Sequence, residues 1–457
     1  MIVMKFGGSS VESAAAIERV ASIVKGRLAR QPVVVVSAMG KTTNRLLALA
    51  ADAVDGKRDD ALAQLRELRE FHLEHARKLA SAADGPAIES VLDEHFQELA
   101  ELVKGLAVLG ELTPRSVDAI SSYGERLSSQ VVTCAFRNAG MDAVHADSRQ
   151  LMITDARHTQ AAPLYEPTYQ RMCAKVAPLA RRGAVVVMGG FIGATENGVT
   201  TTLGRGGSDF TAAIVGAGIG AEEIEIWTDV DGMMTADPNS VPGAHRLRTI
   251  SFSEAAELAY FGAKVLHPST VLPAVEKNIP VLILNSRRPE VPGTRVIGKA
   301  VPSANPIKSI ACKKHITVVN IHSTRMLMAY GFLKQIFEVF DRYETPVDMV
   351  ATSEVSVSVT IDNPARLDEI RRELEQFAEV AVERERAIVC VVGENIRGTP
   401  GIGARIFRAL DRVNVLMISL GGSQWSFSLV IAENDLKEAV RSLHEEFFRE
   451  LDPAVFD

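Results

Sequence analysis

The sequence lacks the cysteine patterns on which disulfide-rich folds and zinc sites depend. It has four cysteines in 457 residues, with no CxxC pair and no Cys/His cluster at zinc-ligand spacing. We therefore expect no metal site built by protein side chains. The thiols are expected to be buried and reduced, at Cys134, Cys173, Cys312 and Cys390.

Long apolar runs and an excess of positive charge are also missing. The apolar stretch at the N-terminus is too short for a signal peptide, and runs such as 33–36 and 184–188 cannot span a bilayer. The formal net charge is −7 and no basic run stands out, which argues against a nucleic-acid partner. These absences favour a cytoplasmic protein that binds neither membrane nor nucleic acid.

Apolar segments of strand length dominate the first part of the chain. Helical stretches separate them, which indicates an α/β domain with a parallel sheet. The segment from about 57 to 131 is rich in helix and charge, and a Pro/Gly-rich segment from 289 to 306 predicts a linker. We expect 281–284 to be the last strand before that linker. The predicted strands are 2–6, 33–36, 184–188, 223–227 and 281–284.

Beyond the linker the chain repeats itself at a shift of 70 positions, which superposes Gly331 on Gly401 and Phe337 on Phe407. Each copy predicts a strand, a helix that follows a glycine, two strands and a second helix. We interpret the repeat as a βαββαβ module present twice.

A lysine precedes a glycine turn at the end of the first strand. Backbone N–H groups of Gly7 and Gly8 can approach phosphate oxygens where the turn opens into a helix. Lys5 can neutralise charge on a transferring phosphoryl group. The alternative is a tight turn with a surface lysine.

A second glycine-rich segment, TTTLGRGGSD at 200–209, leads directly into an apolar helix. Ser208 is expected to be the helix N-cap, and Arg205 offers a planar donor for a carboxylate or phosphate. Asp209, in the first helical turn, can hold a lysine or a metal. The alternative is a flexible loop with ordinary capping. Two such loops favour phosphoryl transfer, with the Lys5 amine and the Asp209 carboxylate close together.

Two other glycine patterns are less convincing. Gly40-Lys41-Thr42 resembles the end of a P-loop, but Val35 stands where that pattern needs glycine. The segment 216–221 fits a loose dinucleotide fingerprint, yet it follows a helix, so its glycines suit a helix end.

Six motifs together resemble the aspartokinase family, most closely its lysine-sensitive, monofunctional type. They are KFGGSS at 5–10, VVVSAMGKTTN at 34–44, SYGERLS at 122–128, TTLGRGGSD at 201–209, WTDVDGMMTADP at 227–238 and FGAKVLHP at 261–268. The resemblance implies an amino-acid-kinase fold, a three-layer αβα sandwich, over 1–298. It also implies two ACT modules, at 299–385 and 386–457, between which first and last strands can be exchanged. No homoserine dehydrogenase is expected after them.

The family's activity is phosphorylation of the β-carboxylate of L-aspartate by ATP with Mg²⁺, giving 4-phospho-L-aspartate on the route to lysine, threonine and methionine. By this resemblance Lys5 and Asp209 are catalytic. The substrate-binding residues are Ser37, Thr43, Glu125, Arg205 and Ser208, with Arg205 on the α-carboxylate and Glu125 on the ammonium group. The ATP-binding residues are Lys5, Gly7, Gly8, Ser9, Thr228, Asp229, Met234, Asp237 and Lys264. At Met234 and Asn239 the sequence departs from some relatives, which leaves open whether it binds ATP as they do.

The first repeat resembles the effector site of lysine-inhibited aspartokinases. Asp348 and Glu354 would pair with the ammonium groups of lysine. The implied effector-binding residues are Met326, Gly331, Phe332, Leu333, Val347, Asp348, Ser353 and Glu354. Ala329 and Pro346 depart from some lysine-sensitive relatives, which leaves threonine or another effector open. The second repeat has Ile418 and Gln424 in place of the acidic pair, so one site per chain is expected, completed in a homodimer or larger oligomer.

Two other functions stay open from the sequence. One is an amino-acid sensor that keeps the kinase fold without catalysis, against which the retained Lys5, Glu125, Arg205 and Asp209 argue. The other is a kinase for a different small carboxylate, which the pairing of Glu125 with Arg205 disfavours.

Overall fold

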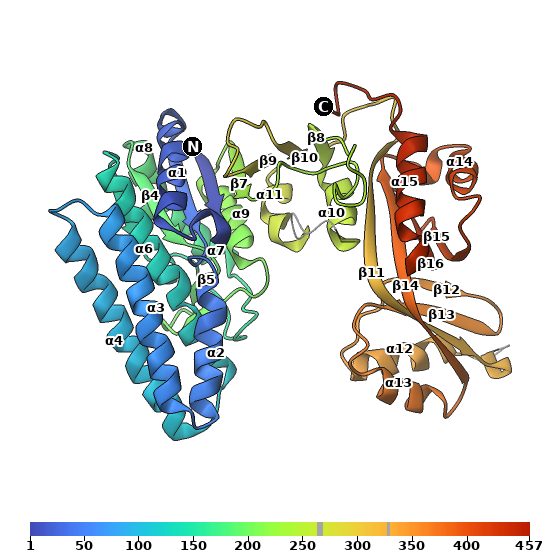
Figure 1. Cartoon of the computed structure of the whole chain (residues 1–457), viewed down its shortest axis with the longest axis horizontal. Helices are drawn as coiled ribbons and strands as arrows, with labels where there is room; N and C mark the ends of the chain where they lie inside the picture. Colours follow the sequence, from blue (N-terminus) through green and yellow to red (C-terminus); the bar gives the residue numbers. More distant parts are fainter. Residues whose placement is uncertain (263–267, 327–329) are drawn as a thin grey trace. The chain divides into compact units, whose positions relative to one another are not determined.

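A computed structural model describes residues 1–262, 268–326 and 330–457 (Figure 1). The chain divides into two compact units. The first comprises Met1–Gly232 and Val265–Lys299, and the second comprises Met233–Lys264 and Ala300–Asp457.

A mostly parallel sheet forms the middle of the first unit. In spatial order the strands that the first unit contributes to it are β3 (Ala143–Ala146), β4 (Val185–Gly189), β2 (Pro32–Val36), β1 (Ile2–Phe6), β7 (Glu223–Thr228), β9 (Val281–Asn285) and β10 (Thr294–Ile297). Strand β1 pairs in parallel with β2 and β7, so that Phe6 lies opposite Val36 and Trp227. All five residues of β1 are buried, because helices cover the strand on both faces.

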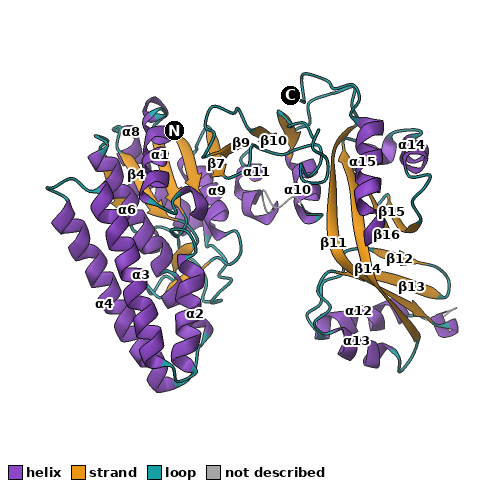
Figure 2. Cartoon of the chain, viewed as in Figure 1, coloured by secondary structure: helices purple, strands orange, loops and turns teal. Residues whose placement is uncertain are grey.

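Helices form a layer on each face of this sheet (Figure 2). On one face, Met4 and Phe6 join a buried apolar cluster with α1 (Ala14–Lys25) and α6 (Tyr123–Asn138). On the other face, α9 (Gly207–Ile219) contacts β1, β2 and β7. This three-layer arrangement confirms the predicted fold class. The remaining helices are α2 (Thr42–Val54), α3 (Arg58–Leu79), α4 (Gly85–Leu109), α5 (Pro114–Ser121), α7 (Tyr165–Arg171), α8 (Ala177–Arg181) and α11 (Leu272–Glu276), beside a hairpin of β5 (Ile192–Ala194) and β6 (Thr200–Thr202).

The prediction that 281–284 is the last strand before a linker is wrong. Strand β10 follows it and pairs antiparallel with β9, with Thr294 opposite Ile283. The strand lies inside the Pro/Gly-rich segment and is only four residues long, so it carries too few alternating positions to stand out in the sequence.

A six-stranded antiparallel sheet forms the centre of the second unit. Its spatial order is β12 (Val350–Thr352), β13 (Ser356–Ile361), β11 (Ile307–His322), β14 (Glu379–Gly393), β16 (Ser426–Ala432) and β15 (Val415–Leu420). The other elements of this unit are β8 (Thr249–Ser251), α10 (Phe252–Tyr260), α12 (Phe332–Arg342), α13 (Leu367–Leu374), α14 (Ile402–Ala409) and α15 (Leu436–Phe447).

The sequence repeat corresponds to two halves of this sheet. Gly331 and Gly401 take the same place in both halves, as left-handed N-caps of α12 and α14 with φ of 83° and 78°. The second copy does not complete its βαββαβ unit from its own stretch of sequence, because α15 is its last regular element in the described part of the chain; it is completed by a strand exchange of the kind that the resemblance implies. The missing strand position is filled by the first half of β11, which pairs with the end of β14 from Ile307 to Lys313.

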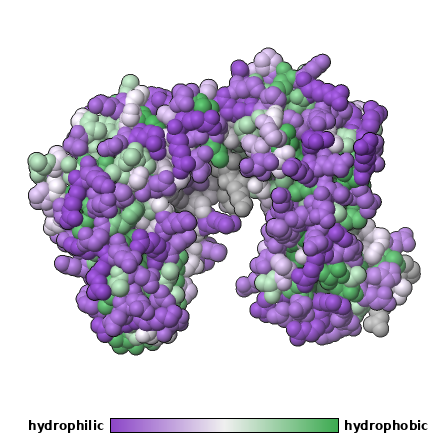
Figure 3. All heavy atoms as spheres, in the orientation of Figure 1, coloured by the Kyte–Doolittle hydropathy of each residue, from purple (hydrophilic) through white to green (hydrophobic). Residues whose placement is uncertain are grey.

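Two of the four thiols are not buried, contrary to expectation. Cys134 and Cys390 are buried, but Cys312 is half-buried and Cys173 is exposed. Cys173 lies in a π-helical turn whose buried positions are Met172 and Val176, so the turn directs Cys173 outward. Among the described residues, none of the helices has the length and apolarity to cross a membrane. Hydrophilic side chains cover most of the face shown in Figure 3.

Candidate active site

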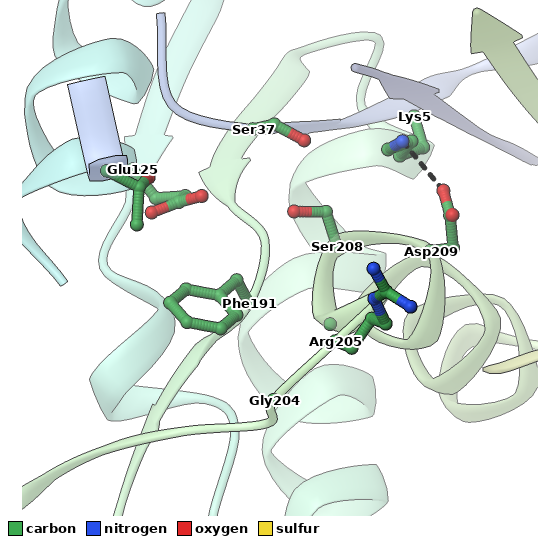
Figure 4. A pocket seen from close by; sticks show the side chains of 11 residues that line it. Lys5, Ser37, Glu125, Phe191, Gly204, Arg205, Ser208 and Asp209 are labelled. Carbon is green, nitrogen blue, oxygen red and sulfur yellow. Dashed lines mark ion pairs between the residues drawn. The ribbon is translucent and has the colours of Figure 1, made fainter. Parts of the chain in front are cut away.

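The two glycine turns meet at the carboxyl end of the sheet in the first unit. Lys5 stands one residue before the end of β1, and its Nζ lies 2.7 Å from Oδ1 of Asp209. Asp209 is in the first turn of α9, as predicted. Both side chains are largely shielded, with 11% and 17% of their surfaces exposed. The predicted proximity of this cation and this anion is therefore observed (Figure 4).

A cavity of about 310 Å³ opens beside this ion pair. It contains all seven residues that the sequence nominated as catalytic or substrate-binding, together with Phe191 and three glycines. Its lining is Lys5, Ser37, Thr43, Glu125, Phe191, Gly204, Arg205, Gly206, Gly207, Ser208 and Asp209. The individual roles of these residues stay predictions, but one site can hold them all.

The arginine turn takes its shape from glycine. Gly204 and Gly206 have φ of 76° and 71°, in the left-handed region that other residues rarely adopt. Gly206 is the N-cap of α9, so the prediction that Ser208 caps this helix is wrong. Ser208 instead lies inside the first turn and lines the cavity, and Figure 4 shows its hydroxyl on the side of Ser37, pointing away from Asp209.

Glu125 is a buried carboxyl group on the far side of the cavity from Arg205. It lies in the first turn of α6, is 4% exposed, and its Oε1 accepts a hydrogen bond of 3.1 Å from Ala38 N–H. Its Oε2 has no hydrogen-bond partner among the described residues. Burial raises the pKa of Glu125 to about 8. An oxygen left in this state can receive a donor from a ligand, and an ammonium group suits it best.

Phe191 is a cavity residue that sequence reasoning missed. Its φ is 63°, an uncommon conformation for a bulky residue, and its backbone is fixed on both sides. The N–H donates to Thr211 Oγ1 at 3.0 Å and the carbonyl accepts from Leu203 N–H at 2.9 Å. In Figure 4 the ring lies between Glu125 and Arg205. A Phe after Gly189-Gly190 at a strand end was the available signal, and alone it indicates only a turn.

The residues predicted to bind ATP do not line this cavity, apart from Lys5. Gly7 and Gly8 directly follow the end of β1. The Gly7 N–H donates to Trp227 O at 3.2 Å, so Thr228 and Asp229 lie at the end of the neighbouring strand. Gly8 packs closely, because a Cβ there would lie 3.0 Å from Gly40 O. The main chain of Gly7, Gly8 and Ser9 therefore lies at the same edge of the sheet as Thr228 and Asp229.

Three further ATP-binding predictions lie elsewhere. Met234 and Asp237 belong to the second unit, and Lys264 is outside the described residues. Their roles stay predictions. Within the described residues there is no cluster of three His, Cys, Asp or Glu side chains that could hold a metal by itself.

The predicted effector residues lie in the second unit around α12 and β12. Asp348 is nearly buried and pairs with Lys313, whose Nζ lies 2.8 Å from Oδ1 of Asp348 and 2.6 Å from Oδ2 of Asp362. Glu354 is exposed. Gly331 caps α12, Phe332 is buried and Leu333 is 41% exposed, while Met326 and Val347 pack on the apolar cluster beneath. Ser353 Oγ lies 2.6 Å from Ser356 Oγ.

Comparison with known families finds two matches. The amino acid kinase family matches residues 1–285, and an ACT domain matches residues 389–447.

Two curated relatives match almost the whole chain. Aspartokinase 3, chloroplastic, of Arabidopsis thaliana is 39% identical over 98% of this chain and 81% of its own length. Lysine-sensitive aspartokinase 3 of Escherichia coli (strain K12) is 35% identical, with 98% of this chain and 99% of the relative covered.

Solved structures of aspartokinase III from E. coli match the fold. The structure in complex with lysine and aspartate, in the T-state, has a TM-score of 0.85 at 33% identity and covers 98% of this chain and 100% of its own. The R-state structure with aspartate and ADP has a TM-score of 0.83 at the same identity and coverage. With identities above 30% over nearly its full length, and with an amino-acid-kinase fold followed by ACT modules, the chain belongs to the aspartokinase family.

Proposed function

We propose that this chain is an aspartate kinase, which transfers the γ-phosphoryl group of ATP to the β-carboxylate of L-aspartate and forms 4-phospho-L-aspartate. One observation carries the proposal: a single cavity presents an ammonium group, a guanidinium group and a buried carboxyl group at separate points of its wall. Lys5, Arg205 and Glu125 supply them. Aspartate carries the matching set of two carboxylates and one ammonium group.

The side chains divide the substrate between them. Glu125 receives the ammonium group at its unpaired oxygen, and Arg205 holds the α-carboxylate with its planar donor fork. The β-carboxylate then points toward Lys5, which offsets the negative charge of the transferring phosphoryl group. Asp209 fixes the Lys5 amine through the 2.7 Å ion pair. Ser37, Thr43 and Ser208 complete the wall with hydroxyl groups.

The nucleotide belongs at the neighbouring strand ends of the same unit. Backbone N–H groups at Gly8 and Ser9 offer donors to phosphate oxygens, whereas the Gly7 N–H is taken by Trp227 O and ties this turn to the strand end that leads to Thr228 and Asp229. Mg²⁺, when bound with ATP, neutralises phosphate charge, and it needs few protein ligands because phosphate oxygens and water supply the rest. The Asp209 carboxylate beside the cavity is the acidic group placed to approach it.

An assay with three amino-acid substrates tests this activity. Purified protein with ATP and Mg²⁺ is supplied with L-aspartate, L-glutamate or N-acetylglutamate, and any acyl phosphate is trapped with hydroxylamine. We expect hydroxamate with L-aspartate and none with L-glutamate or N-acetylglutamate. Hydroxamate with another substrate would identify a different carboxylate kinase. Aspartate binding without hydroxamate would identify a sensor.

We further propose that lysine inhibits the enzyme from the first ACT module, as the lysine-sensitive relative's name suggests for that protein. Asp348 and Glu354 provide the acidic pair for the ammonium groups, and N–H groups from Gly331 to Leu333 at the start of α12 face the carboxylate. The second repeat has Ile418 and Gln424 at the corresponding positions, and therefore lacks this pair.

Replacing Glu354 with glutamine is expected to weaken lysine inhibition. A charged hydrogen bond contributes about 1.5–3 kcal/mol, so the half-inhibiting lysine concentration should rise by roughly tenfold or more, with kcat unchanged. Gln424→Ala, at the equivalent position of the second repeat, is the control and should leave inhibition unchanged. Equal lysine sensitivity in the wild type and in Glu354→Gln would remove Glu354 from the site. Threonine is titrated alongside. If threonine inhibits the enzyme and lysine does not, threonine is the effector.

We also propose a homodimer or larger oligomer formed through the ACT modules, in the cytoplasm. The exposed apolar side chains of Leu416, Ile418 and Leu420 on edge strand β15 support the first proposal. The four free cysteines support a reducing compartment.

A further inference from the structure

A fully buried carboxylate outside the cavity has no part in the reaction described above. Asp118 lies on α5, is 0% exposed, and accepts hydrogen bonds from three neighbours. His158 Nδ1 lies 2.7 Å from Oδ2, Thr159 N–H donates at 3.0 and 3.1 Å, and Thr202 Oγ1 lies 2.5 Å from Oδ1. We refer to Asp118, His158, Thr159 and Thr202 as the Asp118 cluster. A buried carboxylate requires such donors to offset its desolvation.

Two members of the Asp118 cluster border the arginine turn. Thr202 ends β6, and only Leu203 separates it from Gly204. Thr159 has a φ of 70°, and its carbonyl oxygen would lie 3.1 Å from a Cβ on Gly204. The loop at Thr159 therefore packs directly against Gly204. Asp118 holds both this loop and the strand that leads into the turn.

Asp118 stands on the helix that directly precedes the one carrying Glu125. Helix α5 ends at Ser121 and α6 begins at Tyr123, with Ser122 between them, and the Ser122 N–H donates to the main-chain carbonyl oxygen of Asp118 at 3.1 Å. Glu125 follows within the first turn of α6, where it packs so closely on Gly189 that a Cβ on Gly189 would lie 2.9 Å from Glu125 Cβ and 3.1 Å from Glu125 O. One buried side chain thus connects the supports of the two groups on opposite sides of the cavity in Figure 4.

We propose that Asp118 is a positioning residue that fixes the separation between Glu125 and Arg205, and so the fit of the ammonium and α-carboxylate groups of the substrate. This inference rests on the proposed function. Asp118 acts through Thr202 and the turn at Gly204, and it does not line the cavity. Loss of this connection should raise KM for aspartate, because Glu125 and Arg205 could no longer both make well-aligned charged hydrogen bonds to the substrate. The residues expected to bind ATP, at the other strand ends, are not bonded to the Asp118 cluster, so we expect KM for ATP to stay unchanged.

Adjacent threonines on β6 provide a matched test. Thr202→Val removes the hydroxyl that donates to Asp118, whereas Thr201→Val removes an equally buried hydroxyl that bonds Thr154 Oγ1 at 2.6 Å. We expect Thr202→Val to raise KM for aspartate by roughly tenfold, the effect of weakening one charged hydrogen bond to the substrate, with kcat and KM for ATP changed by less than about twofold. Thr201→Val should leave all three constants within about twofold. Thermal unfolding of both variants measures any loss of stability.

The result would overturn the inference if both variants changed KM for aspartate equally, or if neither did. Asp118→Asn should show the same selective rise if it folds, because an amide cannot accept from all three donors. Calorimetric titration with L-aspartate repeats the comparison without turnover. A wild-type chain that makes no hydroxamate would contradict the proposed function, and the order of aspartate affinities in the titration would still decide the role of Asp118.

Discussion

Replacing Lys5 with alanine is expected to lower kcat by about 10²–10³-fold, the usual cost of losing a preorganised electrostatic donor. The Lys5 amine is held 2.7 Å from Asp209 at the cavity wall, where little water can replace it. Phosphoryl transfer depends mainly on alignment and on compensation of charge, so this single cation should dominate the loss. Steady-state kinetics with L-aspartate and ATP measure the effect, and calorimetry shows whether aspartate binding survives.

Lys57→Ala is the control for this variant. Lys57 also pairs with an aspartate, at 3.0 Å from Asp52, but this pair is on the surface. Its removal should leave kcat within about twofold, since exposed ion pairs contribute little. Near-normal turnover by Lys5→Ala would exclude Lys5 from the reaction and leave the cavity without its phosphoryl-stabilising group.

Replacing Glu125 with glutamine is expected to raise KM for aspartate by about 10–100-fold at pH 8, because a charged hydrogen bond to the ammonium group contributes about 1.5–3 kcal/mol. The carboxyl group is buried and already receives Ala38 N–H, so glutamine can occupy the same space with limited disturbance. The activity at saturating aspartate should fall less than the affinity. Unchanged KM in this variant would remove Glu125 from ammonium recognition.

The wild-type enzyme should show a matching pH dependence. Burial raises the pKa of Glu125 to about 8, so at lower pH the empty site holds a neutral carboxyl group, which must lose its proton to pair with the substrate ammonium. As the pH rises from 6 to 8, KM for aspartate should therefore fall by up to about tenfold per pH unit, and aspartate binding should release a proton. Calorimetry in buffers of different ionisation enthalpy measures that release. A flat profile, or proton uptake, would contradict this assignment.

The close approach of Lys5 and Asp209 could be predicted from the sequence because both residues sit at ends of regular elements. In a parallel α/β sheet, the carboxyl ends of the strands and the N-termini of the helices that follow them lie at one edge. We therefore expect a lysine next to last in a buried strand and an acid in the first turn of a helix after a glycine loop to lie at that edge. The repeat in the second unit was equally visible, since Gly331 and Gly401 occupy equivalent N-caps.

Features that depend on contacts between distant segments could not be predicted. Phe191 lines the cavity because Thr211 and Leu203 fix its backbone at a positive φ, and no local pattern encodes those partners. Ser208 fits an N-cap by residue type, but the two positive-φ glycines before it begin the helix one residue earlier than Ser208. No local pattern shows that the first half of β11 completes the second repeat across about 80 residues of sequence, and only the family resemblance implied such an exchange.

A crystal structure with L-aspartate and ADP would show directly how the cavity holds its substrate. We expect the ammonium nitrogen at about 3 Å from Glu125 Oε2, the α-carboxylate on the guanidinium group of Arg205, and the β-carboxylate directed at Lys5. Aspartate bound outside this cavity, or bound inside it with its β-carboxylate on Arg205 and its α-carboxylate toward Lys5, would contradict this expectation.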